Sequence, residues 1–302
     1  MAILSSNPLG KTGITVTRLS AGGHFTNGPC GHTDIARRVR EIHHMIDSGI
    51  TYFDVQWEPE EQAMAEVIKT RRDEIAIAWP LHGLTQLGGK LTAKYVVDYC
   101  HDHQKRYGVQ HVEVLLWIAL ELSPDTQVSV IHELRTAFEQ LRAEGFCDHL
   151  GFSCHHSAAM ALHTISTCDC FKVMMVPYSP MHPAAGRQLL AEARARGVGT
   201  VGMKPFGGGG GFFNKVFASE FTRPDLAPFH HAAAPYQAAI KWVLQNPNLD
   251  CTVPGMHSVQ QIDEILQAAA QPITPQDQQI LDLLKTSQTQ SGVETQLKND
   301  WD

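Results

Sequence analysis

The chain has 302 residues, a formal net charge of −7 at pH 7 and a pI of about 6.2, and 43% of its residues are hydrophobic. Nucleic acids and anionic membranes attract basic surfaces, so the charge excludes both as expected partners. No apolar run is long enough to cross a bilayer, and the first residues lack the charged start and apolar core of a signal peptide. The composition therefore predicts a globular cytoplasmic protein with a sizeable core.

Cysteine and histidine are the reactive residue types whose numbers stand out. The seven cysteines are an odd number without the spacing of a zinc or thioredoxin-type motif, so reduced thiols are expected. Seventeen histidines are several times the usual share. Because most of them are expected to be structural or exposed, only those that follow predicted strands are interpreted as functional.

Short apolar runs alternate along the chain with segments whose apolar residues recur at helical spacing. A hairpin over residues 8–16 comes first. In chain order there follow strand 18–21, helix 34–47, strand 49–54, helix 60–69, strand 75–79, helix 92–107, strand 112–118, helix 125–144, strand 149–153, helix 157–166, strand 172–176, helix 185–196, strand 199–203, an irregular segment 207–229, helix 235–245, strand 250–253 and helix 259–270. An extra helix over 275–284 and a polar tail over 285–302 end the chain.

Eight strand-then-helix units predict an α/β protein, a closed (β/α)8 TIM barrel, as a single domain over residues 1–302. A doubly wound open sheet is the rival architecture. It is disfavoured because such sheets rarely hold eight regular units and usually carry a glycine-rich fingerprint after the first strand. The five glycines at 207–211 follow the seventh predicted strand instead.

Polar residues gather where the predicted strands end, which in a barrel is the rim that carries the active site. They are His24, Asp54, Gln56, Trp79, His82, Glu121, Ser153, Cys154, His155, His156, Tyr178, His182, Lys204 and His257. Each residue alone is more often a cap or a turn former. The convergence of the set on one mouth predicts an active or binding site there.

Several segments resemble the aldo-keto reductase superfamily. Residues 9–19 are similar to its amino-terminal hairpin, and residues 49–54 are similar to its second strand with the active-site aspartate. Residues 151–153, 203–209 and 253–261 look like the segments with which the family holds NADP. The resemblance runs in the correct order from residue 8 to about residue 270. It implies a barrel that reduces carbonyl groups with hydride from NADPH.

The same resemblance shows an altered catalytic set. Family members use an Asp, a Tyr, a Lys and a His, and of these only Asp54 is present. No tyrosine lies in residues 55–61, the lysine position falls on Ala78 or Trp79, and the histidine position falls on Ile118. Loss of a positioned general acid costs on the order of 10²–10⁴ in rate, so the usual proton relay is expected to be severely impaired.

The resemblance also implies where the cofactor would lie. Tyr178 would stack on the nicotinamide, and Ser153 would meet its carboxamide. Lys204, Pro205, Phe206 and Gly207 would surround the pyrophosphate, and Ser258 and Gln261 would meet the adenosine phosphate. No Arg or Lys is adjacent in sequence to these last two residues, and His257 is the nearest candidate.

Three functions remain open at this point. The first is a divergent NADP-linked oxidoreductase acting on a small organic substrate, in which Asp54, His24 and His155 carry out proton transfer. The second is a lyase, isomerase, hydrolase or oxygen-dependent enzyme that uses the same three residues to bind a divalent metal in place of a nicotinamide. The third is a catalytically silent binding subunit. The sequence identifies neither the substrate nor the oligomeric state.

Overall fold

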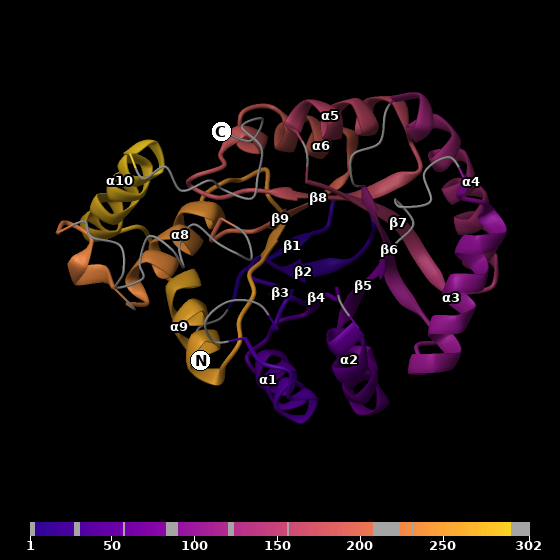
Figure 1. The fold of residues 1–302 in the computed structure, drawn as a ribbon, viewed down its shortest axis with the longest axis horizontal. Coiled ribbons are helices and arrows are strands. Elements are labelled where there is room, and N and C mark those ends of the chain that lie inside the picture. The colour runs from indigo at the N-terminus through magenta and orange to yellow at the C-terminus, as the bar shows by residue number, and fades with distance from the viewer. Residues whose placement is uncertain are drawn as a thin grey trace.

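A computed structural model describes residues 4–26, 31–56, 58–82, 90–119, 124–155, 157–207, 224–230 and 232–290. Its centre is an eight-stranded parallel sheet in which each strand pairs with the next one along the chain. The strands are β3 (Ala21–Gly22), β4 (Tyr52–Asp54), β5 (Ala76–Leu81), β6 (Val112–Ala119), β7 (Cys147–Cys154), β8 (Phe171–Pro177), β9 (Gly199–Met203) and β10 (Cys251–Val253). Figure 1 shows them grouped in the middle of the molecule.

The sheet closes on itself between its first and last strands. Parallel bridges join Leu19 to Thr252 and Gly22 to Gly255. The Ser20 N–H donates to the Thr252 carbonyl at 2.9 Å, and the Gly22 N–H donates to the Pro254 carbonyl at 3.0 Å. The predicted (β/α)8 barrel is therefore confirmed, although β3 lies three residues beyond the start of the strand expected at 18–21.

Helices alternate with the strands and surround the sheet in Figure 1. They are α1 (Ile35–Asp47), α2 (Glu58–Arg71), α3 (Ala93–Tyr107), α4 (Pro124–Ala143), α5 (Ala158–Thr167), α6 (Leu189–Arg196), α8 (Ala234–Leu244), α9 (Val259–Ala269) and α10 (Pro275–Gln290). Local chemistry sets several of their ends. Asp34, Thr92 and Ser157 accept a backbone N–H as N-caps, and Gly108 and Gly197 end α3 and α6 in the left-handed conformation.

The alternation of side chains along each strand separates two cores. The barrel interior is filled by side chains of moderate or small size, among them Tyr52, Ala78, Leu116, Met175 and Val201. The layer between strands and helices is larger and holds most of the aromatic rings of the strands. Of two neighbouring residues on a strand, one therefore faces the barrel interior and the other faces the helices.

The hairpin of β1 (Ser6–Pro8) and β2 (Thr15–Thr17) closes the amino-terminal end of the barrel. Leu9 and Val16 are fully buried in the interior core. Gly10 has a φ of +54°, and a Cβ there would lie 2.3 Å from the Gly199 nitrogen, so only glycine allows the turn to approach β9 this closely. The hairpin thus covers the end of the barrel opposite to the carboxyl ends of the strands.

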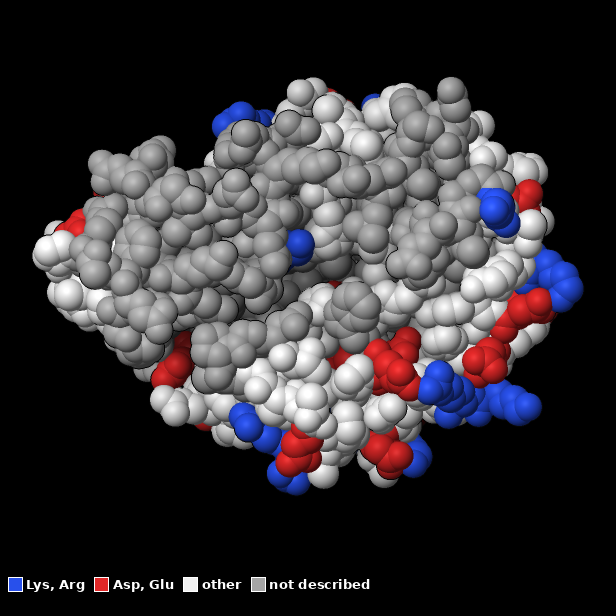
Figure 2. All heavy atoms as spheres, viewed as in Figure 1, with Lys and Arg blue, Asp and Glu red and all other residues white. Residues whose placement is uncertain are grey.

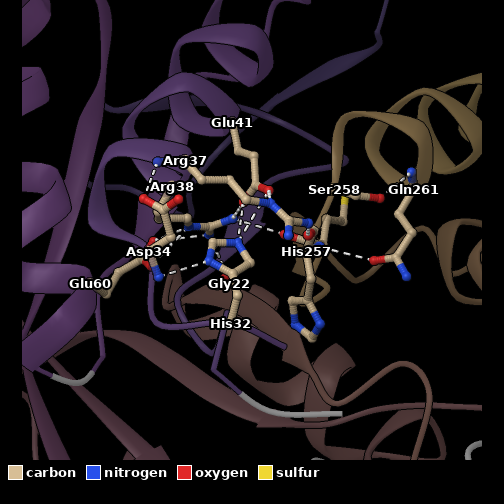
Figure 3. A network of polar contacts seen from close by, with 11 residues as sticks. Gly22, His32, Asp34, Arg37, Arg38, Glu41, Glu60, His257, Ser258 and Gln261 are labelled. Carbon is tan, nitrogen blue, oxygen red and sulfur yellow. Dashed lines mark hydrogen bonds and ion pairs between the residues drawn. The ribbon is translucent and has the colours of Figure 1, made fainter. Parts of the chain in front are cut away.

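A buried ionic network fastens the seam between β3 and β10 (Figure 3). The guanidinium of Arg38 on α1, with no exposed surface, pairs with Glu60 on α2 at 2.9 Å. It also donates to the Met256 carbonyl at 2.8 Å and to the Gly22 carbonyl at 3.3 Å. Burial raises the pKa of Glu60 and the Arg38 charge opposes that rise. One side chain thus joins two helices to both strands of the seam.

The carboxyl-terminal end differs from the prediction. The segment expected as a polar tail, 285–302, begins as helix, because α10 continues to Gln290. Polar residues can extend a helix where no Gly or Pro interrupts them, and the first glycine here is Gly292. Residues 291–302 lie outside the described part, as does most of the segment predicted to be irregular at 207–229. Within the described residues, no helix combines the length and apolarity needed to cross a membrane.

Candidate active site

Asp54 ends β4 at the barrel mouth, and its side chain is 5% exposed. The Gln56 side-chain amide donates to Asp54 Oδ1 at 2.6 Å. Burial raises the pKa of Asp54 to about 8, the Gln56 hydrogen bond opposes the rise, and the nearby Glu60 charge adds to it. The carboxyl group is therefore mostly protonated at neutral pH.

The strand register shows which residue lies opposite this carboxyl group on the neighbouring strand. Asp54 pairs with Ala78, whose methyl group lies in the barrel interior. The neighbouring Trp79 belongs to the layer under α3, where its ring lies 5.9 Å from that of Tyr107. Of the two positions that the sequence left open for the family's lysine, Ala78 is thus the interior one. An ammonium there would have lowered the pKa of Asp54.

Two further residues bear on the comparison with the family pattern. Ile118, where the resemblance implies a histidine, follows Val114 and Leu116 at intervals of two along β6 and so shares their inward face. Tyr52 lies two residues before Asp54 in the interior, and its buried hydroxyl has no hydrogen-bond partner among the described residues. Burial raises its pKa well above 10. Trp57, in the loop expected to hold the tyrosine, lies outside the described part.

The loop after β4 is held by a histidine. His82, directly after β5, makes a short hydrogen bond from Nε2 to the Gln56 carbonyl. Burial lowers the pKa of His82 and the bond to Gln56 opposes this effect. Because the Gln56 side chain in turn binds Asp54, His82 positions the amide that contacts the carboxyl group.

His24 follows Gly23 on the rim, and Gly23 packs so tightly on β4 that a Cβ there would be 2.6 Å from the Asp54 carbonyl oxygen. Burial, assisted by the charges of Lys204, His82 and His257, lowers the pKa of His24 to about 4. His155 lies elsewhere on the rim, with its Nε2 3.4 Å from Ser153 Oγ at the end of β7.

Figure 2 shows the face of the molecule that is turned to the viewer in Figure 1. This face is hollowed near its centre, with a basic side chain at the edge of the hollow. Among the described residues, no three His, Cys, Asp or Glu side chains are arranged to hold a metal ion. His24, Asp54 and His155, the set considered for a divalent metal, therefore do not form such a group.

Ser258 and Gln261 form a reciprocal cap at the start of α9 (Figure 3). Ser258 Oγ accepts the Gln261 N–H at 3.2 Å, and Gln261 Oε1 accepts the His257 N–H at 2.9 Å. This cap leaves the N–H groups of Val259 and Gln260, in the first turn of α9, without a partner among the described residues. Such a helix start attracts anions.

A cation missed by the sequence analysis lies beside this helix start. Arg37 on α1 donates to the His257 carbonyl at 2.6 Å and pairs with Glu41 at 2.9 Å (Figure 3). The His257 ring bonds to the His24 backbone, and its buried Nε2 has no hydrogen-bond partner among the described residues. The two residues are 220 positions apart in the chain, so no local pattern could have paired them.

Residues 204–207 make a tight turn after β9. The Gly207 N–H donates to the Lys204 carbonyl at 2.9 Å, and Pro205 has no N–H. The Phe206 ring packs edge-on against Tyr236 of α8, with 5.1 Å between the ring centroids. The turn is thus held by its own hydrogen bond and by packing on α8, and it presents few free N–H groups to a ligand.

Tyr178 occupies the layer between the strands and α8. Its hydroxyl accepts a hydrogen bond from Asn246 at 2.9 Å, and its ring lies 5.0 Å from that of Trp242. A Cβ at Gly186 would be 2.8 Å from the ring, so that side is filled as well. These contacts hold Tyr178 away from the interior core that lines the barrel.

Comparison with known proteins agrees with this geometry. The model of the Aldo/keto reductase family matches residues 18–285. Aldo-keto reductase AKR11C1 from Bacillus halodurans is similar in its holo form, with a TM-score of 0.70 at 18% identity, and in its apo form, with 0.67 at 17%. Each similarity covers 99% of this chain and 100% of the other, and at such identities it supports the fold alone. The family match over most of its length shows that the chain belongs to the aldo/keto reductase family.

Proposed function

We propose that the chain is an NADP-linked oxidoreductase that reduces the carbonyl group of a small organic substrate, with Asp54 as the proton donor. The observation that carries this proposal is the buried Asp54 carboxyl group, beside Ala78 in place of a lysine, with a pKa raised to about 8 by burial. NADPH, when bound, would supply hydride to the carbonyl carbon.

Asp54 has the properties that a general acid needs near neutral pH. The Gln56 amide donates to Oδ1, so the proton is held on Oδ2. A carbonyl oxygen gains negative charge as hydride arrives, and the proton on Oδ2 would neutralise it. A group with a pKa near 8 is mostly protonated at pH 7 yet releases its proton more readily than an ordinary phenol. The carboxyl group would thus take over the role of the family's tyrosine.

The two histidines expected to share this role differ. With a pKa near 4, His24 is neutral at pH 7 and cannot supply a proton as an imidazolium. We propose that it donates or accepts a hydrogen bond at the substrate. His155, beside Ser153, is the second candidate for proton transfer.

The chain's own donors fit the adenosine phosphate of the cofactor. The Val259 and Gln260 N–H groups and the Arg37 guanidinium lie around the start of α9. Together they form a donor set for a phosphate group. Ser153 and the turn of residues 204–207 complete the proposed cofactor surface, from which Tyr178 is left out because of its contacts with α8.

Replacing Arg37 with methionine tests the cofactor assignment. The loss of a charge-assisted contact of roughly 1.5–3 kcal/mol should raise the dissociation constant for NADPH about 10- to 100-fold. Affinity for NADH, which lacks the 2′-phosphate, should change little. Fluorescence titration of both cofactors checks this. Arg40→Met, an exposed arginine on the same helix, is the matched control and should bind NADPH as the unmodified protein does.

The proposal as a whole is tested by NADPH binding followed by turnover. Fluorescence titration should show saturable binding, and NADPH absorbance should fall when a panel of small aldehydes and ketones is added. No binding at about 1 mM NADPH would correspond to a free energy weaker than about −4 kcal/mol and would rule the proposal out.

A further inference from the structure

His103 on α3 is enclosed by aromatic rings in the layer outside β5. Its side chain is 12% exposed. Its ring stacks on that of Tyr99 with 4.0 Å between the centroids. The Tyr107 ring lies 5.5 Å away, and the nearly perpendicular Trp79 ring lies 6.4 Å away. Tyr99, His103 and Tyr107 are four residues apart and so share one face of α3. Because aromatic rings attract cations, this place suits a positively charged imidazole.

Both ring nitrogens of His103 face oxygen acceptors. Nδ1 lies 2.9 Å from the Tyr99 carbonyl oxygen, which can only accept, so Nδ1 carries a proton. Nε2 lies 3.5 Å from Oε1 of Glu61 on α2, a side chain that is 4% exposed. That oxygen has no hydrogen-bond partner among the described residues. A second proton, on Nε2, gives the buried carboxylate its counter-charge, so the geometry favours an imidazolium.

The charges around His103 agree with an imidazolium. Burial lowers the pKa of His103, but Glu61, the Tyr99 carbonyl and the Asp102 charge outweigh burial and raise it above its usual 6.5. The other charged or titratable groups near the ring come from α2, α3 and the end of β5, and they are Glu58, Arg106, Tyr107 and His82. Glu58 and Arg106 pair with each other, which leaves Glu61 as the buried carboxylate for His103.

Tyr99 connects the enclosed imidazolium to the loop that holds the proposed proton donor. The Tyr99 hydroxyl accepts the His82 backbone N–H at 3.3 Å and donates to the Pro80 carbonyl at 3.5 Å. The His82 imidazole makes the short hydrogen bond to the Gln56 carbonyl. The Gln56 side-chain amide donates to Asp54 Oδ1 at 2.6 Å. A continuous series of contacts thus runs from α3 to the carboxyl group at the barrel mouth.

We propose that His103 is a positioning residue for Asp54. As an imidazolium paired with Glu61, it holds Tyr99 in place, and Tyr99 holds His82. His82 in turn holds the amide that contacts the carboxyl group. This inference rests on the proposed role of Asp54 as proton donor and adds a control of that role by pH. When His103 loses its proton, the loop after β4 is held less firmly.

Loosening these contacts has a defined effect on Asp54. The Gln56 hydrogen bond opposes the burial that raises the pKa of Asp54 to about 8. If the Gln56 amide is no longer held, it donates less often, so the pKa of Asp54 should rise further while the carboxyl group loses its orientation. A general loss of structure would instead expose Asp54 and return its pKa toward 3.8. The direction of the shift therefore separates positioning from a merely structural role.

Carbon-13 NMR of protein labelled at the aspartate carboxyl carbons and the histidine rings measures both titrations. Asp54→Asn and His103→Gln identify the two signals. In the unmodified protein, His103 should titrate above pH 6.5. In His103→Gln and in Tyr99→Phe, Asp54 should titrate about 1 pH unit higher than in the unmodified protein, as expected for the loss of a charge-assisted hydrogen bond. His101→Gln, at an exposed position of α3, is the matched control and should leave the Asp54 titration unchanged.

Thermal melting checks that each variant is folded. Tyr99→Phe removes a single hydroxyl group and decides the test if His103→Gln does not fold. The proposal is overturned if His103 is neutral at pH 6, if no folded variant raises the titration of Asp54, or if His101→Gln raises it equally. The measurement needs neither NADPH nor turnover. An Asp54 that titrates near pH 4 in the unmodified protein would contradict the proposed proton donor, and the shift between variants would still decide the role of His103.

Discussion

Replacing Asp54 with asparagine should remove most of the carbonyl reduction and should also stabilise the folded protein. The amide is nearly isosteric and can still accept the Gln56 hydrogen bond, but it cannot donate a proton as an acid. Loss of a general acid lowers the turnover number on the order of 10²–10⁴-fold. Steady-state kinetics with NADPH and a reducible carbonyl substrate measure the first effect, and urea unfolding measures the second.

The gain in stability should depend on pH in a defined direction. The pKa of Asp54 is raised from 3.8 to about 8 by burial, so between these values the folded state holds a proton that the unfolded state has released. The contribution of Asp54 to stability is complete below pH 4 and is lost as pH rises through 8. The difference between Asp54→Asn and the unmodified protein should therefore widen between pH 4 and 8, by at most about 1.4 kcal/mol per pH unit.

The pH profile of activity gives a further check on the same group. A proton donor must be protonated, so turnover should hold steady below pH 8 and fall about tenfold per pH unit above it. Asp73→Asn, at an exposed turn after α2, is the control and should alter neither activity nor the pH dependence of stability. Full activity of Asp54→Asn, or a loss of stability at pH 8, would show that Asp54 is ionised and not the acid.

Replacing Arg38 with methionine should be among the most destabilising changes in the protein. The substitution keeps most of the apolar stem but leaves Glu41 and Glu60, both almost fully buried, without their shared partner. Breaking a buried ion pair on one side costs about 3–5 kcal/mol. The seam between β3 and β10 would also lose the bonds to the Gly22 and Met256 carbonyls. Urea unfolding at pH 7 measures the change.

A double variant separates the charge effect from the loss of packing. Glu41 keeps its ion pair with Arg37, so Glu60 is the carboxylate that Arg38→Met leaves unpaired. Adding Glu60→Met to Arg38→Met removes that carboxylate, so the double variant should be more stable than Arg38→Met alone. Arg40→Met on the exposed face of α1 should change the free energy of unfolding by less than about 0.5 kcal/mol. If Arg38→Met behaves like Arg40→Met, the seam does not depend on this network.

Much of the fold follows from local pattern. The apolar runs and helical periodicities place every strand and helix of the barrel to within a few residues, and three predicted helices begin at the residues that cap them, Asp34, Thr92 and Ser157. The predicted boundary that differs most among the strands is that of the first strand, because its ends are set by pairing with the last strand. Leu19 to Gly22 pairs with the last strand, 230 or more residues later, and the short bridges at that seam have no local signal.

At the site, the sequence places Asp54 at a strand end, because residue identity and strand order are readable from the chain itself. Only the tertiary structure shows that Ala78 faces the carboxyl group while Trp79 faces α3, because that choice depends on the register between strands. The same holds for Arg37 beside His257. The protonation of a carboxyl group and the partners of a charged side chain depend on burial and on contacts between segments that are distant in the sequence. Such contacts cannot be read from the sequence pattern.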